Sequence, residues 1–485
     1  MPSAPRRARV LRGTVAYAAA AVLQRTIGFV LLPLYARVLT PPEYGQIGVL
    51  LTVTAAAGTV MALGLETAVF RTYSILRSEP AQRARFINTI GAFVAIVCAA
   101  SAAFAALVLA PVISSALDVS SVAIGIGFVG AALTTASTVI PLAVLRAQER
   151  LRDYLWLTGV QVFLTVGLTL LFVVVLRLGV NGWMLAIAAA AAMLLVRGLL
   201  VLGHRWSVHF DTSQLAAALA FGIPMVPHAL AHWGLALSDR VVLGVFLDSF
   251  HVGVYYIAYQ FGLPISVLGI AMAQAAQPLF ARASVSSDAD HDLGRAVTLH
   301  ATTVLVVGMS VAVLGKPAIV AFLPASYADA ADLVAWIALG STIFALYFIP
   351  MNAITILMGR NRWVWVITLT AAAANVALNL LLVPQIGVIA AALDTVIGYT
   401  VLLAGVSWYA RRVLDRALPV EWSRIGLAAM LVTAGTAFAM LVNFESAVAT
   451  LSVRAIVIVV VIGVFVALGL VRPSTLLRRT EPKNS

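Results

Sequence analysis

The sequence predicts an all-α membrane protein of fourteen transmembrane helices, from its composition, its mean hydropathy and its pattern of charges. Hydrophobic residues make up 62% of the 485 residues and charged residues only 10%, whereas about 25% of a typical soluble chain is charged. The mean hydropathy of +1.03 reflects the whole chain rather than one segment. A soluble core cannot absorb this much apolar surface, but a bilayer can.

Fourteen apolar runs reach the length of about 20 residues that a helix needs to cross a bilayer. The expected spans are 13–36, 46–65, 86–112, 121–145, 154–176, 182–203, 215–246, 253–280, 296–323, 332–358, 363–383, 386–408, 424–443 and 453–471. Basic residues precede the first run, as they do in a signal peptide. This run is too long for a signal peptide and has Arg25 near its middle, so we interpret it as an uncleaved first span.

Loops rich in basic residues alternate along the chain with loops that have few. The positive-inside rule requires this alternation when the count of spans is correct. Most of the 31 Lys and Arg residues lie at inside ends. The exceptions are Arg37, Arg177, Lys316 and Arg454 at outside ends, and Arg25, Arg197 and Arg240 within spans. The pattern predicts a multi-pass protein of the cell membrane with both termini in the cytoplasm. The net charge of +12 therefore reports topology, and no nucleic-acid partner is expected.

A weak internal repeat divides the spans into six, six and two. Glu43-Tyr44-Gly45 aligns with His251-Val252-Gly253, and Gly179-Val180 with Gly387-Val388, both at an offset of 208 residues. An even number of spans per copy gives two pseudo-symmetric bundles of the same orientation, related by an axis along the membrane normal. The predicted parts are a basic cytoplasmic N-terminus (1–12), an N-terminal six-helix bundle (13–205), a C-terminal six-helix bundle (215–408), two additional transmembrane helices (424–471) and a cytoplasmic tail (472–485).

The absence of catalytic motifs favours a transporter over an enzyme. The sequence contains no HExxH, no P-loop GxxxxGK[ST] and no GxSxG, and its loops are too short for a soluble catalytic domain. The single cysteine, Cys98, can form neither an intramolecular disulfide nor a Cys-based zinc site. No metal and no cofactor are therefore expected.

Polar residues at membrane depth are costly, so each is a candidate for function. Arg25 is either half of a buried ion pair or an anion-binding group in a central cavity. Asp394, well inside the twelfth span, is a rare acid at this depth and a candidate for coupling to a cation or proton.

The seventh span is unusual because it is longer than a bilayer requires and contains Pro224 and Pro227, which favour a kink. Its polar residues lie on or near one helical face: His228, His232, Asp239 and Arg240. They either pair with neighbouring helices near the outer surface or line the cavity, where the histidines could titrate near neutral pH.

Further polar residues complete the candidate set. They are Gln24 on the first span, Gln161 on the fifth, Tyr255 and Tyr259 on the eighth, and Asn375 and Asn379 on the eleventh. The asparagines either bond helices together or bind substrate. Glu66 and Arg71 end the second span on its cytoplasmic side. Glu66 is a second candidate for ion coupling, while Arg71 either meets a substrate phosphate or snorkels to the interface.

Four segments of the chain resemble the polysaccharide flippases of the Wzx type, whose superfamily also holds the multidrug MATE exporters and the lipid II flippases. The segments are Leu32-Pro33-Leu34-Tyr35-Ala36-Arg37-Val38-Leu39-Thr40-Pro41-Pro42-Glu43-Tyr44-Gly45, then Gly222-Ile223-Pro224-Met225-Val226-Pro227 with Ser238-Asp239-Arg240, then Gly253-Val254-Tyr255-Tyr256-Ile257-Ala258-Tyr259, and finally Asn375-Val376-Ala377-Leu378-Asn379-Leu380-Leu381-Leu382-Val383-Pro384 with Gly387 and Ala390-Ala391-Ala392. Their order and spacing, rather than any one motif, carry the resemblance.

The resemblance implies two pseudo-symmetric bundles forming a V around a central cavity. It also implies movement of polyprenyl-diphosphate-linked oligosaccharides to the outer leaflet, with Arg25, Arg71 and Arg240 as diphosphate partners. Membrane lipids and the glycan polymerase and glycosyltransferases of the same pathway are the implied partners. A MATE-like cation-coupled drug exporter would need more acids in its cavity, and a membrane glycan polymerase a larger outside loop. A lipid II flippase is the closer alternative.

Overall fold

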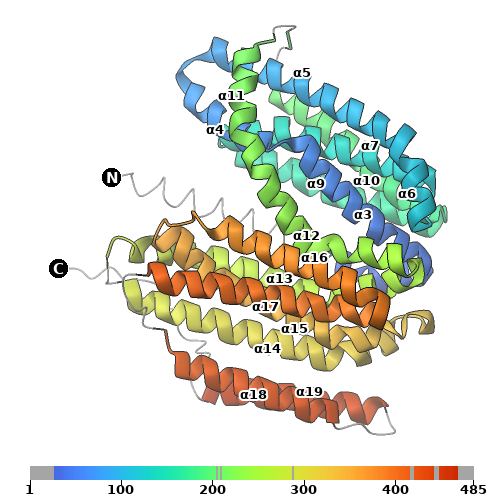
Figure 1. Ribbon diagram of the computed structural model, residues 1–485, viewed down its shortest axis with the longest axis vertical. Helices are drawn as coiled ribbons and strands as arrows, with labels where there is room; N and C mark the ends of the chain where they lie inside the picture. The colour runs from blue at the N-terminus through green and yellow to red at the C-terminus, as the bar shows by residue number, and fades with distance from the viewer. Residues whose placement is uncertain are drawn as a thin grey trace. The chain divides into compact units, whose positions relative to one another are not determined.

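The computed structural model describes residues 27–203, 206–207, 210–286, 289–414, 420–441 and 447–467, which fold into helices joined by short turns (Figure 1). The α-helices are α2 (Leu32–Ala36), α3 (Pro41–Ala62), α4 (Leu65–Ile75), α5 (Pro80–Phe104), α6 (Ala110–Leu117), α7 (Ser121–Ser137), α8 (Ala143–Ala147), α9 (Leu151–Thr169), α10 (Gly179–Leu202), α11 (Thr212–Gly222), α12 (Val226–Phe246), α13 (Ser249–Ala283), α14 (Asp290–Phe322), α15 (Ala330–Asn352), α16 (Val364–Ile386), α17 (Val388–Val413), α18 (Trp422–Leu441) and α19 (Ala447–Ala467). Short 3₁₀ or π segments adjoin them: η1 (Leu76–Ser78), η2 (Ala105–Leu109), η3 (Thr138–Leu142), η4 (Leu170–Val175), η5 (Ile223–Met225), η7 (Ala325–Tyr327) and η8 (Ala353–Leu357). These ranges contain no β-strand, so the prediction of an all-α membrane fold is confirmed.

Within the described residues, 12 helical segments are long and apolar enough to cross a membrane. They are Pro41–Ile75, Pro80–Leu117, Ser121–Ala147, Leu151–Val175, Gly179–Leu202, Thr212–Phe246, Ser249–Ala283, Asp290–Phe322, Ala330–Leu357, Val364–Ile386, Val388–Val413 and Ala449–Ala467. They correspond to the predicted spans two to twelve and fourteen. The predicted thirteenth span coincides with the 20-residue helix α18, and the first is described only from residue 27. The count of fourteen stays a prediction.

The described residues pack into two compact units. Unit 1 comprises the described residues as far as Ile257 together with Thr368–Asp394, and unit 2 comprises Ala258–Ile367 and the described residues from Thr395 on. Helices α13, α16 and α17 each contribute to both units. The division into two six-helix bundles and a C-terminal pair remains a prediction.

Within unit 1, the first turns of α3 and α13 cross at two glycines. A Cβ atom on Gly45 would overlap the carbonyl oxygen of Ser249, and a Cβ atom on Gly253 would overlap the carbonyl oxygen of Pro41. Pro41 and Ser249 are related by the same offset of 208 residues as Gly45 and Gly253. The contact is therefore reciprocal, like an isologous interface between two copies of one surface. The repeat thus has a physical counterpart, because only glycine allows two backbones to approach this closely.

Two spans of unit 1 are interrupted at a point where they touch. Between α3 and α4, Leu63 and Gly64 both have positive φ (49° and 68°), and between α11 and α12 the chain passes through the 3₁₀ segment Ile223–Met225. A Cβ atom on Gly64 would overlap the carbonyl oxygen of Gly222. On one side of this crossing α3 packs on α12, and on the other α4 packs on α11. The kink expected near Pro224 is present, and it has a counterpart in the second span.

Helix starts in unit 1 follow local sequence signals. Thr40 and Glu43 form a capping box at the start of α3, in which the Thr40 backbone N–H donates to Glu43 Oε2 at 2.8 Å. Asp211 caps α11 by accepting the backbone N–H groups of Ser213 and Gln214 at 3.0 and 3.1 Å. The Ser213 hydroxyl, followed by these backbone donors, holds the pKa of the Asp211 carboxyl below its usual range.

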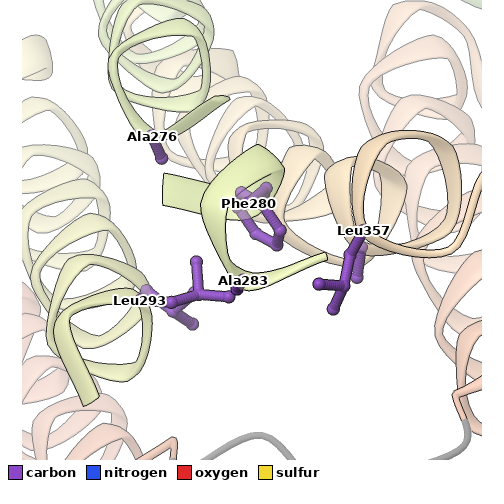
Figure 2. Packing of buried hydrophobic residues seen from close by; sticks show 7 residues of the cluster. Ala276, Phe280, Ala283, Leu293 and Leu357 are labelled. Carbon is purple, nitrogen blue, oxygen red and sulfur yellow. The ribbon is translucent and has the colours of Figure 1, made fainter. Parts of the chain in front are cut away.

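One apolar cluster of unit 2 joins α13, α14 and the π segment η8 (Figure 2). Phe280 is 1% exposed and lies with Ala276 and Ala283 on α13, facing Leu293 of α14 and Leu357 of η8. Burying a phenylalanine side chain of this kind stabilises a fold by about 1.5–3 kcal/mol. The cluster therefore ties the end of α13 to the start of α14.

The last two described helices, α18 and α19, run side by side and pack on α14 (Figure 1). The contact is formed by Met309 and Val313 of α14, Ala428 of α18, and Val461 and Phe465 of α19. Helix α14 also packs along α15. Helix α15 and the pair α18 and α19 thus all pack against α14, within unit 2.

Candidate substrate and ion site

A buried ionic cluster forms in unit 1 where α12 meets the first part of α13. Asp239 and Arg240 are 3% and 2% exposed, and Arg240 Nη1 lies 3.2 Å from Asp239 Oδ1. The Tyr255 hydroxyl donates to the other carboxylate oxygen of Asp239. The guanidinium also donates to the Ala236 carbonyl oxygen and lies 5.5 Å from the ring centre of Tyr256, within cation–π range. The predicted residues Asp239, Arg240 and Tyr255 are therefore brought together.

Three more predicted residues join this cluster from α16 and α17. Asn375 Nδ2 donates to the backbone carbonyl oxygen of Asp394 at 3.0 Å, and Asn379 Nδ2 donates to that of Asn375 at 3.1 Å. All three residues are at most 1% exposed. Asp394 interacts electrostatically with Asp239. Sequence spacing alone could not show that acids of the seventh and twelfth spans are neighbours.

The carboxylate of Asp394 is the unusual group of the cluster. Both of its oxygens are buried and accept no hydrogen bond from the described residues. An ionised carboxylate in this situation is costly unless a proton or a cation accompanies it. Asp239 is paired with the guanidinium of Arg240, whereas no described group donates a hydrogen bond to the Asp394 carboxylate.

The described residues contain no group of three or more His, Cys, Asp or Glu side chains that could hold a metal ion. The side chains of Asp239, Asp394 and Tyr255 carry oxygen atoms as their polar groups. Hard monovalent or divalent cations prefer oxygen donors, and a proton needs only one carboxylate.

The two histidines of α12 lie away from the buried end of the helix. His228 and His232 are one turn apart, interact electrostatically, and are exposed, whereas Asp239 and Arg240 are buried. The indole N–H of Trp233 donates to the Thr52 carbonyl oxygen at 2.9 Å and so fixes α12 against α3. The polar residues predicted on this helix therefore form two groups, the exposed histidines and the buried ion pair.

A second polar group lies at the other end of unit 1, around α4 and α8. Glu66 forms an ion pair with Arg146 at 3.0 Å, and the Arg71 guanidinium lies 4.7 Å from the ring centre of Phe221. Gln148 donates to the Tyr73 hydroxyl at 2.6 Å. The loop charges of the sequence predicted topology but did not show that Arg146 pairs with Glu66.

Two of the remaining candidates have contacts with residues outside the ionic cluster. Gln161 lines a narrow crevice between α9 and α10, with Trp156 and Arg197. The Tyr259 hydroxyl lies 3.2 Å from that of Tyr399, within unit 2. Gln24 and Arg25 lie outside the described residues.

Comparison with known proteins gives a family match and a shared fold. A family model described as "Polysaccharide biosynthesis protein" matches residues 10–284, more than half of the chain. No curated protein matches by sequence. Among solved structures, the lipid II flippase MurJ in its inward closed conformation has a TM-score of 0.72 and 12% identity, covering 95% of this chain and 99% of that one.

Two transporters of the MOP superfamily are also similar. An inward-facing multidrug resistance MATE family transporter has a TM-score of 0.64 and 13% identity over 86% of this chain and 96% of its own. A MOP superfamily transporter from Pyrococcus furiosus has a TM-score of 0.54 and 14% identity over 88% and 97%. At these identities the likeness shows the fold alone.

Proposed function

The chain belongs to the polysaccharide biosynthesis protein family, and we propose from this membership that it is a flippase for a polyprenyl-diphosphate-linked oligosaccharide. It moves the glycan from the inner to the outer leaflet of the cytoplasmic membrane by alternating access, with both termini in the cytoplasm. The family match over residues 10–284 is the observation that carries this proposal. The fold shared with a lipid II flippase supports it.

The physical task explains why such a protein is needed. A sugar chain and a diphosphate lose their water in the hydrocarbon core without replacement, at a cost of several kcal/mol for each polar group. A polar path through the protein lowers this cost, while the polyprenyl tail stays in lipid. The glycosyltransferases that build the glycan and the polymerase that consumes it are the partners that this function requires.

Arg71 is the described arginine that best fits a diphosphate partner. Its side chain is exposed and stacks on Phe221, so it can meet an anion without breaking an ion pair. Arg240 is buried against Asp239 and would have to leave that carboxylate first. Arg25 remains a proposed partner from its position in the first span. Planar guanidinium groups suit phosphate because they donate two parallel hydrogen bonds.

We expect Arg71→Gln and Arg25→Ala each to lower flipping about tenfold or more, equivalent to about 1.4 kcal/mol of lost phosphate binding, without reducing protein level. Flipping is measured in proteoliposomes as the appearance of a labelled lipid-linked oligosaccharide on the opposite face. Arg152→Gln, which removes an exposed arginine from the first turn of α9, serves as the charge-matched control. Parental rates in the Arg71 and Arg25 variants would remove these residues from the diphosphate site.

The same proteoliposomes test the proposed function against its two alternatives. We expect the parent chain to flip lipid-linked oligosaccharide and to leave the cationic dye ethidium where it is. Flipping of lipid II in preference to the oligosaccharide would assign the chain to peptidoglycan synthesis. Transport of ethidium alone would overturn the flippase proposal in favour of a MATE-like exporter.

The driving force is proposed to enter at Asp394. The buried Asp394 carboxylate accepts no hydrogen bond from the described residues and interacts electrostatically with Asp239. Such an acid binds a proton or a monovalent cation when it is accessible to one side of the membrane and releases it to the other. Glu66 is already neutralised by Arg146, which makes it the weaker candidate for coupling. Binding and release of one charge can bias two conformations only through a difference in affinity between them.

A further inference from the structure

Unit 2 contains a cavity of about 690 Å³ that is separate from the ionic cluster of unit 1. It is lined by residues of α14, α15 and α18 and by Arg454 of α19. Its volume falls in the range of about 300–1,000 Å³ that is typical of ligand pockets. Trp336 and Leu339 of α15 line it and are 41% and 45% exposed, so the cavity opens at the apolar surface of the unit.

The walls of the cavity are apolar along most of its length. Its threonines turn their hydroxyl groups back to their own helices: Thr433 donates to the Ala429 carbonyl oxygen and Thr436 to that of Val432. Their methyl groups are therefore left for the cavity. A ligand in this part of the cavity needs a hydrocarbon surface rather than hydrogen-bonding groups.

Charged side chains gather at one end. Lys316 of α14 and Arg454 of α19 line the cavity there, together with Asp332, which pairs with Lys316 at 2.8 Å. Among the described residues that line the cavity, two cations and one acid lie at this end. An anionic group entering here would share Lys316 with Asp332 and would share Arg454 with the Val313 carbonyl oxygen.

Arg454 is positioned at this end by a hydrogen bond to a carbonyl group of α14 that has no backbone donor because of Pro317. Pro317 has no backbone N–H and therefore cannot donate to the carbonyl oxygen of Val313, four residues earlier in the helix. Arg454 Nη1 donates to this carbonyl oxygen at 3.2 Å. A neighbouring helix commonly repairs a proline in this way within a membrane. The repair fixes a buried guanidinium, 7% exposed, at the wall of the cavity.

The length of the cavity matches one leaflet of a bilayer. The lining residues of α14 run from Leu305 to Lys316, a rise of about 16 Å along a helix. Half of a hydrocarbon core of about 30 Å is about 15 Å. An acyl chain that starts with its headgroup at Lys316 would therefore end near Leu305.

We propose that this cavity is a binding site for an anionic phospholipid of the bilayer, with the phosphate at Arg454 and Lys316 and an acyl chain along α14. The lipid fills the cavity between α15 and α18 and stabilises the packing of α18 and α19 against α14. The charge at the mouth selects an anionic headgroup, and the apolar walls accept any saturated chain of matching length.

Native mass spectrometry of the purified full-length protein tests the site, with phosphatidylglycerol and phosphatidylcholine of identical chains as probes. We expect the protein to retain phosphatidylglycerol in preference to phosphatidylcholine. Arg454→Gln and Lys316→Gln should each weaken phosphatidylglycerol retention about fivefold, the effect of about one basic residue at a lipid surface. Ala312→Phe, which fills the apolar wall, should weaken retention of both lipids.

Two controls separate lipid binding from loss of fold. Arg454→Gln keeps a hydrogen-bond donor on the side chain but removes its charge, and its melting temperature should stay within a few degrees of the parent. Arg37→Gln removes an exposed arginine of unit 1 and should leave lipid retention unchanged. Equal retention of the two lipids, or retention unaffected by all three cavity variants, would overturn the proposal. Stronger retention of a polyprenyl phosphate than of phosphatidylglycerol would overturn it in favour of the substrate tail.

Discussion

Replacing Asp394 with Asn should leave the protein folded and abundant but remove the response of flipping to a cation gradient. The side chain keeps its size, and both oxygens of the Asp394 carboxylate lack a hydrogen-bond partner among the described residues, so the substitution breaks no bond seen in the structure. The backbone carbonyl that accepts from Asn375 at 3.0 Å is retained. An amide cannot take up a proton at neutral pH and holds a cation less tightly than a carboxylate. The substitution therefore removes the exchangeable charge alone.

The measurement compares flipping rates in proteoliposomes with an imposed proton gradient, an imposed sodium gradient, and neither. We expect the parent to respond to one of the two gradients and Asp394→Asn to respond to none. Asp329→Asn removes an exposed acid before α15 and should respond like the parent. A gradient response in Asp394→Asn equal to that of the parent would refute coupling at this residue.

Asp239→Asn should destabilise the protein, in contrast to Asp394→Asn. Asp239 is the ion-pair partner of Arg240 and accepts the Tyr255 hydroxyl. Breaking a buried ion pair by removing one partner costs about 3–5 kcal/mol, because an uncompensated charge is left behind. Low protein level in Asp239→Asn, together with normal level in Asp394→Asn, would separate the structural acid from the coupling acid.

The sequence was sufficient to predict the family and the helical fold, because both depend on features that are local in the chain. Apolar runs and loop charges predicted the spans, and the predicted membrane fold and resemblance are confirmed. The repeat aligned Gly45 with Gly253 but did not predict that these two residues contact each other, as they do in the structure.

The partners of the polar residues could not be predicted, because helical periodicity gives the direction of a side chain but not which helix it faces. Arg240 forms an ion pair with Asp239, its own neighbour in the chain, and its guanidinium also lies over the ring of Tyr256 on α13. Asp394 interacts electrostatically with Asp239, although 155 positions separate them in the sequence. Arg454 was recognised only as an exception to the charge rule, and its contact with Val313 depends on a proline in a different helix.

Replacing Gly45 or Gly253 with Ala should destabilise the protein strongly, because each added Cβ atom would overlap a backbone carbonyl oxygen of the facing helix. Backbone atoms cannot move aside as a side chain can, so α3 and α13 would have to separate. Overpacking of this kind costs about 1–3 kcal/mol. We expect a lower melting temperature in detergent and a smaller monodisperse fraction after size-exclusion chromatography for each variant.

The reciprocal geometry makes a sharper prediction for the pair. Because Gly45 and Gly253 meet at one contact, the double variant should cost less than the sum of the two single variants, once the helices have already separated. Gly159→Ala and Gly167→Ala, at positions with no atom within 4 Å of the added Cβ, should be neutral or stabilising, since alanine favours a helix by up to about 1 kcal/mol over glycine. Strictly additive losses, or a Gly45→Ala protein as stable as Gly159→Ala, would show that the two repeats do not meet at this crossing.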